Sequence, residues 1–262
     1  MAQLAKQYEN EPIVFIAVNS GTAPGEVASY AKKNGVAWPI IVDPDRSFEQ
    51  AAGLPEISLR NVTQVKIVTG DGTMRNGDWS DPKKSVDAAL SGAKWKYDLQ
   101  DIPASLSGAR KAIEFGYFNL ALNDINRASK SKAPAEKDAA KLLETVVLDE
   151  VKKKAAAAWE LGQQKKYYEA HKAFVQIQTR YAGYDIPDTV AKAEKWLGSQ
   201  DAVRAEIRAV KILDGAKEFI NSPRQAVKSR AITQLKNVVS RFPETEAAQE
   251  AKRLLAEAGG TD

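Results

Sequence analysis

One apolar stretch near the start of the chain limits the folds that this sequence can adopt. Residues 13–18 are six consecutive apolar residues, most of them β-branched, and an Asn-Ser-Gly turn signal follows them. A run of this kind is typical of a strand that is buried on both faces of a parallel sheet. Such a strand needs partners, and residues 38–42 and 65–69 are the candidates. We therefore expect an α/β fold over this part of the chain.

The segments between and after these strands complete that pattern. The spacing of apolar residues predicts helices over 2–8, 25–34 and 46–52, with Val27 and Tyr30 on the buried face of the second. Strands 62–69 and 73–76 flank Gly-Asp-Gly, which is a strong hairpin signal. An Asp81-Pro82 pair then opens a last helix that ends at Leu90.

The composition excludes several kinds of chemistry. The 262 residues contain no cysteine, so disulfides, thiolate metal sites, cysteine nucleophiles and dithiol redox chemistry are excluded within them. The single histidine, His171, would have to serve any zinc site or Ser-His-Asp triad, but a histidine beside a lysine on a helix is typical of a surface or groove. Asp43 and Asp45 form a carboxylate pair with no third ligand at a recognisable spacing, which favours a solvent-facing turn over a cation site. We predict no catalytic residue, no metal site and no cofactor.

The charge of the chain gives little support to a nucleic-acid partner. Residues 1–98 carry 11 basic and 12 acidic residues, and residues 99–262 carry 27 and 22, which together give a net charge of +4. The lysines of the basic part alternate with acids at helical spacing and lack interleaved aromatic residues, as on a solvated face. The longest apolar run is six residues, which is too short to span a bilayer. We expect neither a nucleic-acid partner nor a membrane span.

The rest of the chain is predicted to be helical. We expect a linker over 93–107, because glycine, aspartate and proline interrupt the pattern there, and an all-helical domain over 108–262. Residues 135–161 should form one long helix. We expect its buried side to carry Leu142, Val146, Val151, Ala155 and Trp159.

Three segments of the helical part share an internal register. An alanine is followed by large apolar residues at helical spacing in three sets: Ala121, Ile125 and Ala128; Ala170, Phe174 and Ile177; Ala231, Leu235 and Val238. Each set resembles the second helix of a tetratricopeptide unit, in which the alanine lets two helices approach closely. The steps of 49 and 61 residues differ from a regular repeat, so we expect separate tetratricopeptide-like hairpins.

Four aromatic residues of this part are candidates for a groove that binds a protein partner. They are Tyr117, Phe118, Tyr167 and Tyr168. Packing between helices is the alternative role for each of them.

The first 92 residues resemble part of a known family. The segments concerned are LAKQYENEPIVFIAVNSG, VAWPIIVDPDRSFEQAAGL and VTQVKIVTGDGTMRNG. In this order they resemble the second half of a thioredoxin-like redoxin domain, of the thiol-disulfide oxidoreductase and peroxiredoxin-related kind. The resemblance implies an incomplete thioredoxin-like sheet over residues 1–92.

Two departures from the family affect function. The family's central strand and its CxxC motif would lie before Met1, and that strand would sit between the strands at 13–18 and 65–69. We therefore expect an incomplete chain that begins at an internal methionine, because a gap in mid-sheet costs about 1–3 kcal/mol for each unmet backbone group. The family's cis-proline loop corresponds to Val62 and Thr63, where proline is absent and a trans peptide is expected.

The resemblance leads to two hypotheses about function. In the first, the chain is a truncated, extracytoplasmic bacterial thiol-disulfide oxidoreductase whose helical domain recruits protein partners. In the second, it is a redox-inactive protein-interaction scaffold. An upstream signal segment would place the protein outside the cytoplasm or in the periplasm, and without one it would be cytoplasmic.

Overall fold

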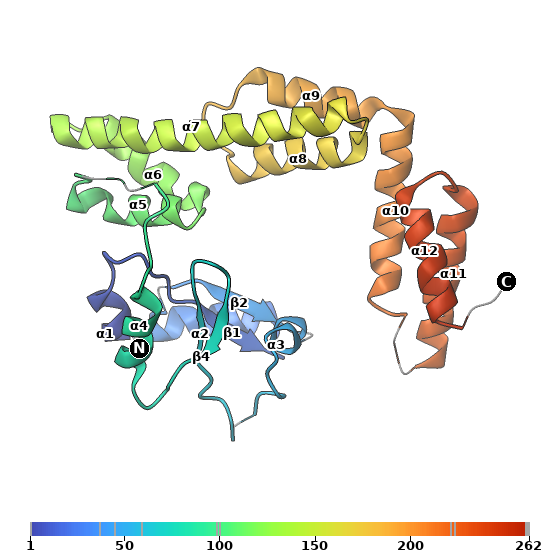
Figure 1. Ribbon diagram of the computed structural model, residues 1–262, viewed down its shortest axis with the longest axis horizontal. Helices are drawn as coiled ribbons and strands as arrows, with labels where there is room; N and C mark the ends of the chain where they lie inside the picture. Colours follow the sequence, from blue (N-terminus) through green and yellow to red (C-terminus); the bar gives the residue numbers. More distant parts are fainter. Residues whose placement is uncertain are drawn as a thin grey trace. The chain divides into compact units, whose positions relative to one another are not determined.

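A small mixed α/β region is followed by a mainly helical region (Figure 1). The computed structural model describes residues 2–36, 38–44, 46–58, 60–97, 99, 101–220, 222 and 224–259. The chain divides into two compact units, one ending at Leu143 and the other beginning at Glu144. The division falls inside the longest helix, α7 (Pro134–Gln163).

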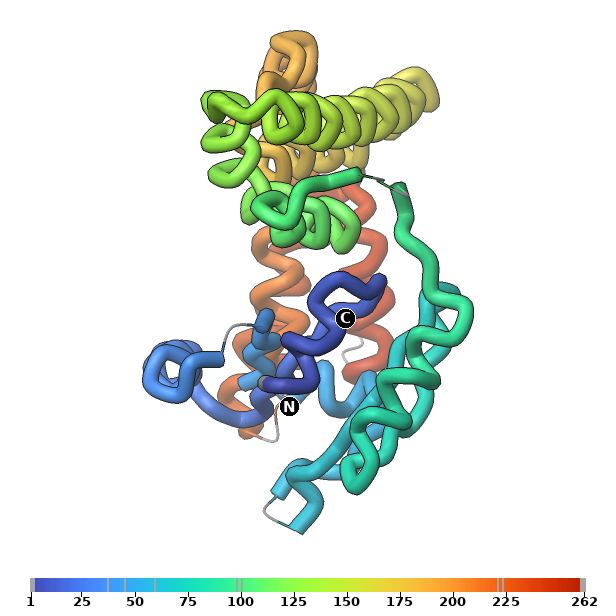
Figure 2. Tube along the Cα trace, turned by 90° about the vertical axis from the view of Figure 1, so that its left-hand side faces the viewer, coloured from blue at the N-terminus to red at the C-terminus, as the bar shows by residue number. Residues whose placement is uncertain are grey.

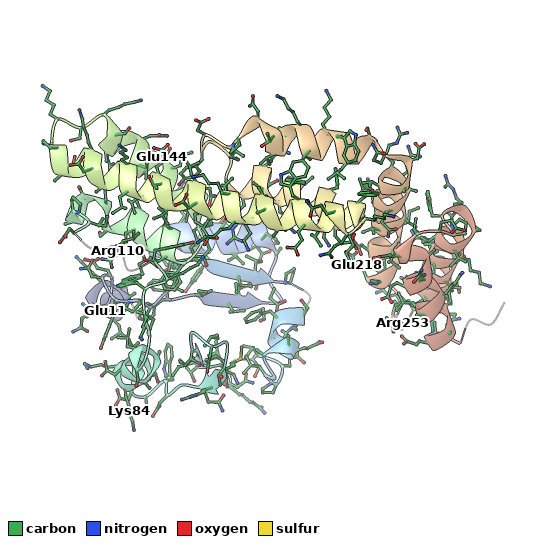
Figure 3. The ribbon with its side chains drawn as sticks, turned by 45° about the horizontal axis from the view of Figure 1, so that its top comes forward. Glu11, Lys84, Arg110, Glu144, Glu218 and Arg253 are labelled. Carbon is green, nitrogen blue, oxygen red and sulfur yellow. The ribbon has the colours of Figure 1, made fainter. Side chains whose placement is uncertain are left out.

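Two parallel strands form the first sheet. Strand β1 (Ala17–Ser20) lies beside β2 (Ile40–Asp43) (Figure 3). In their register Ala17 is opposite Ile40. Helix α1 (Ala2–Gln7) precedes β1, α2 (Pro24–Asn34) connects the strands, and α3 (Ser47–Ala51) follows β2. Gly35 ends α2 at φ +62°, a left-handed conformation that glycine adopts without strain.

The hairpin and the helix after it confirm the turn and cap predictions. Strands β3 (Lys66–Val68) and β4 (Met74–Asn76) are antiparallel, and the predicted Asp-Gly turn joins them. Helix α4 (Pro82–Leu90) begins after Asp81, whose carboxylate accepts a hydrogen bond from the backbone N–H of Lys84 at 3.0 Å. This helix packs against β3 (Figure 2).

The predicted burial of residues 13–18 and of helix α2 is partly wrong. Val27 of α2 is buried, but Tyr30 is 65% exposed. Strand β1 begins four residues after the start of the apolar run, and Ile16 and Val18 are 44% and 43% exposed. Among the described residues, β1 pairs only with β2 and β3 only with β4. A strand with a neighbour on one side alone keeps part of its surface in contact with solvent.

The remainder is helical, as predicted for this part of the chain. A 3-10 turn, η1 (Ala104–Leu106), leads into eight helices. Besides α7 they are α5 (Ser107–Glu114), α6 (Phe118–Ser129), α8 (Tyr167–Arg180), α9 (Asp188–Ser199), α10 (Asp201–Lys217), α11 (Gln225–Arg241) and α12 (Glu246–Glu257). Helices that follow one another in the chain pack as pairs, among them α5 with α6, α8 with α9, and α11 with α12.

The three predicted sets of core residues are confirmed, but the predicted buried side of α7 is partly wrong, since only Val151 of its five residues is buried. All nine residues of the alanine-led sets are buried. In α7 the buried face carries Leu143, Val147, Val151 and Ala158, whereas Leu142 and Trp159 are more than 40% exposed. An apolar residue beside the buried stripe of a helix fits the helical period nearly as well as a residue within that stripe. Periodicity alone therefore did not identify the buried face of α7.

No helix in the described parts of the chain combines the length and the apolar character that crossing a membrane requires.

Candidate functional site

The second unit contains a groove between α8, α10 and α12. Its volume is about 470 Å³. The apolar part of its lining comes from Val210, Leu213 and Ala247, and Tyr168 lies at one side. Six charged residues complete the lining: Lys172, Glu206, Asp214, Lys217, Glu246 and Glu250. An apolar patch within a charged rim is typical of a surface that binds another polypeptide.

Glu206 holds the wall of this groove together. This side chain on α10 is only 7% exposed, and its two carboxylate oxygens accept hydrogen bonds from the backbone N–H groups of Glu246 (2.9 Å) and Ala247 (2.8 Å). The first N–H groups of a helix have no partner within the helix, and the helix dipole favours a negative charge beside them. Glu206 therefore caps α12 and ties it to α10.

The two remaining glutamates of the rim differ in their electrostatic surroundings. The pKa of Glu246 is raised, mainly by the neighbouring carboxylate of Glu169 and then by burial. The pKa of Glu250 is lowered to about 2, mainly because Arg253 donates a hydrogen bond to it, with Lys217 second. Carboxylates thus crowd around Glu246, with Lys166 as the opposing charge nearby, and a further cationic group would be favourable there.

Of the four aromatic candidates, only Tyr168 lines the groove. The Lys172 ammonium lies over its ring at 5.7 Å, and burial raises the pKa of its hydroxyl. Tyr167 is 37% exposed and packs edge-on against Trp196, with the ring centroids 6.4 Å apart.

The other two candidates belong to the first unit. Phe118 is 3% exposed and packs in the core as part of α6. Tyr117 is half-buried and precedes that helix. The structure therefore does not expose Phe118 to a partner, which agrees with the alternative role of packing between helices.

Sequence reasoning missed the contributions of α10 and α12 to the groove. The apolar residues of α10 recur at helical spacing, and this signal could have identified its buried side, which includes Leu213. No local signal indicated that α10 packs against both α8 and α12, since these helices are distant in the sequence.

The only histidine makes a contact between helices. His171 Nε2 of α8 lies 3.2 Å from Glu194 Oε1 of α9, and the ring is largely buried. The described residues contain no group of three or more histidine, aspartate and glutamate side chains that could hold a metal ion.

The two residues at the predicted redoxin loop are exposed. Val62 and Thr63 are exposed in the loop before β3, and the described residues include no cis peptide bond.

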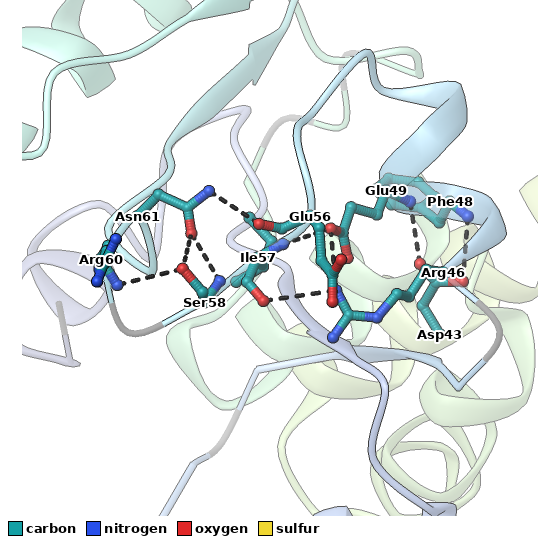
Figure 4. Close-up of polar contacts among 9 residues, drawn as sticks. All are labelled: Asp43, Arg46, Phe48, Glu49, Glu56, Ile57, Ser58, Arg60 and Asn61. Carbon is teal, nitrogen blue, oxygen red and sulfur yellow. Dashed lines mark hydrogen bonds and ion pairs between the residues drawn. The ribbon is translucent and has the colours of Figure 1, made fainter.

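Asp43, one half of the predicted carboxylate pair, is buried and accepts hydrogen bonds from the backbone N–H groups of Phe48 (3.0 Å) and Glu49 (2.9 Å) (Figure 4). This carboxylate stabilises the start of α3, so the prediction that it faces solvent is wrong. Asp45, the other half of the predicted pair, lies outside the described residues.

A second carboxylate orders the loop that precedes Val62. Glu49 is 2% exposed, and its Oε1 accepts a hydrogen bond from the backbone N–H of Ile57 at 2.5 Å (Figure 4). Arg46 lies 3.4 Å from the same oxygen. These contacts join α3 to the loop and give both carboxylates a structural role.

The groove is the candidate surface of the second unit, and the first unit has β1 and β3 each paired on one side only within the described residues. No protein-family model, curated protein sequence or solved structure matches this chain significantly.

Proposed function

We propose that this chain binds a protein partner through the groove between α8, α10 and α12. The observation that carries the proposal is the lining itself, in which the partly exposed Val210 and Tyr168 lie among charged side chains. The lining includes four carboxylates and two ammonium groups. The bound element is therefore a peptide segment in which an apolar residue lies next to lysine or arginine.

Each part of such a segment has a counterpart in the groove. Its apolar side chain would cover Val210 and the ring of Tyr168, which are only partly buried in the unbound protein. Its cation would lie near Glu246 and Asp214. Asp214 makes no ion pair with a described residue. Aromatic residues such as Tyr168 often supply much of the binding energy at protein interfaces.

Selection from a phage-displayed library of random peptides tests this proposal. The wild-type chain should enrich peptides that combine an apolar residue with a basic one. Tyr168→Ala should weaken the binding of an enriched peptide about tenfold or more, because the aromatic contact is lost. Asp214→Lys should weaken it at least about threefold, because the attraction to the cation becomes repulsion.

Glu160→Lys is the matched control, because it makes the same charge reversal on an exposed position of α7 that is not part of the groove lining. It should leave the affinity unchanged. Enriched peptides that are acidic, or that bind both charge-reversal variants equally, would contradict the proposal.

A second proposal concerns the first unit: we propose that it is a thioredoxin-like redoxin region whose sheet accepts a further strand. The parallel β1–β2 pair and the antiparallel β3–β4 hairpin are the pairings that the resemblance implies. The lack of hydrogen bonding between the two sheets in the described residues supports it, since the family has another strand at that place. Thiol-disulfide exchange would need cysteines from that further segment, because these 262 residues contain none.

Amide hydrogen exchange tests whether the side of β1 is open. The N–H groups of Ala17 and Gly21 bond to carbonyls at β2, at 3.0 and 2.9 Å. In a parallel pair, alternate residues direct their backbone groups to opposite sides, so the N–H of Val18 points away from β2. Val18 should therefore exchange much faster than Asn19, and equal protection of the two amides would contradict the proposal.

The redox part of this proposal has its own assay. The purified chain should reduce insulin no faster than buffer, and a fusion that supplies an apolar strand with CxxC ahead of α1 should gain reductase activity and slow the exchange of Val18. A fusion that folds but leaves both readouts unchanged would favour the redox-inactive scaffold.

A further inference from the structure

The first unit has a cavity that neither proposal uses. Its volume is about 280 Å³, and it lies between the residues that follow α1, the segment after α4 and the start of α5. Its apolar lining includes Trp95, Ile102 and Ala104. Among the lining residues, two basic side chains face a single carboxylate, so the charge of the lining is positive. A cavity of this size suits a small molecule better than a folded segment.

Arg110 on α5 is the basic residue without an anionic partner. Its guanidinium lies over the Trp95 ring at 4.6 Å, and Phe115 packs edge-on against the same ring at 6.4 Å. With respect to the described residues, Arg110 makes no ion pair, and its Nε is buried without a hydrogen-bond partner. Figure 3 labels this side chain. A guanidinium carries five N–H donors in a planar fork and stays charged, so its capacity to bind an anion is unused here.

The neighbouring charged groups do not satisfy Arg110. Glu114, one turn later on α5, accepts a hydrogen bond from the backbone N–H of Tyr97 at 3.0 Å through Oε2, while its Oε1 has no partner. Lys111 donates to the backbone carbonyls of Tyr8 (3.4 Å) and Glu9 (3.2 Å). Burial lowers the pKa of Lys111, whereas Glu9 raises it. The hydrogen bonds of Lys111 are therefore used within the protein, and those of Arg110 remain for a ligand.

We infer that this cavity binds a small organic carboxylate. The carboxylate pairs with the Arg110 guanidinium, because the planar fork matches two carboxylate oxygens. The apolar body of the ligand lies against Ile102 and Ala104, and the stacked Trp95 ring holds the guanidinium in place. A phosphate is a poorer match, since Glu9 also lines the cavity and a doubly charged ligand would meet stronger repulsion from it.

Titration of the wild-type chain with benzoate, followed by ¹H–¹⁵N NMR, tests this inference. Saturable shifts are expected for the Arg110 Nε–H and Trp95 indole N–H signals. Benzamide, which has the same shape without the charge, should produce no comparable shift. Absence of saturation at millimolar benzoate, or equal shifts with benzamide, would overturn the inference.

Variants assign the binding to Arg110. Arg110→Gln should weaken benzoate binding at least about tenfold, the loss expected for a charge-assisted hydrogen bond. Arg127→Gln on α6 is the control, because Arg127 is exposed, pairs with Asp124 at 2.8 Å and does not line the cavity. Unchanged affinity in Arg110→Gln would overturn the assignment.

Two further arms keep the test decisive. If Arg110→Gln does not fold, Arg110→Lys retains the charge without the planar fork and should give an intermediate affinity.

A peptide's C-terminal carboxylate shares the same chemistry, so a pentapeptide with a free C-terminus is compared with its amide. Tighter binding of the free peptide than of benzoate would assign the cavity to chain ends instead of free acids.

Discussion

At the scale of single residues, Glu206 is a buried charged side chain whose loss should destabilise the second unit. It is buried and accepts two backbone hydrogen bonds across α10 and α12. We expect Glu206→Ala to lower the free energy of unfolding by about 1–3 kcal/mol, because the N–H groups of Glu246 and Ala247 would lose their partners. Urea unfolding measures this change.

The control for that prediction is Glu160→Ala, since Glu160 is exposed on α7. This substitution should change the free energy of unfolding by less than about 0.5 kcal/mol. An equal effect of the two substitutions would show that Glu206 does not stabilise the start of α12.

Asp71 provides the residue-scale test of pH dependence. Its carboxylate accepts hydrogen bonds from Thr69 Oγ1 (2.5 Å) and from the backbone N–H of Thr73 (3.0 Å), and these bonds lower its pKa to about 2, with Thr69 contributing most. A pKa below the unfolded value means that the carboxylate stabilises the turn above about pH 4 and that this effect is lost as the pH falls toward 2.

An NMR titration checks this prediction. The Thr73 amide shift should change with a midpoint near pH 2, and the change should disappear in Asp71→Asn. A midpoint at the ordinary aspartate value of 3.8 would mean that the turn does not hold the carboxylate as described.

At the scale of elements, an aromatic contact joins α7 to α8. Phe174 of α8 is fully buried, and its ring meets that of Trp159 edge-on with centroids 5.1 Å apart. Phe174→Ala should lower the free energy of unfolding by about 3–5 kcal/mol, because the substitution leaves a cavity that close-packed helices fill only partly.

The adjacent residue is a matched control for this prediction. Val175 is 38% exposed, so Val175→Ala should cost less than about 1 kcal/mol. Thermal unfolding of both variants separates the two cases. Similar losses of stability in the two variants would show that the burial of Phe174 does not stabilise the contact between α7 and α8.

At the scale of the whole molecule, buried apolar side chains are distributed unevenly. Among the described residues before η1, only Val27, Ala52, Val86 and Leu99 are buried and apolar, whereas the helices that follow carry the rest of the core. Regions with few buried contacts open at a lower free-energy cost than densely packed ones. Amides in residues 2–97 should therefore exchange with solvent faster than those in α5–α12.

Hydrogen exchange measured by mass spectrometry tests this difference. The chain unfolded in urea gives the reference rates for each peptide fragment. Equal protection of the α/β region and the helices would contradict the prediction that the α/β region opens at a lower free-energy cost.

Local chemistry explains which parts of the fold were predictable. The Asp-Gly turn and the Asp81-Pro82 helix start each depend on a few adjacent residues, and the structure has both. The alanine-led core sets were also found, because a helix repeats its buried face every three to four residues. Of the groove, the same reasoning found only Tyr168.

The sequence by itself thus determined where helices, turns and most buried helical faces lie, because those features follow from neighbouring residues. The tertiary structure decided which elements meet. It placed Glu206 at the start of α12, forty residues further along the chain. It also gave β1 a single neighbour among the described strands and determined which face of α7 is buried. Contacts between distant segments depend on how whole elements pack, and no short pattern encodes that choice.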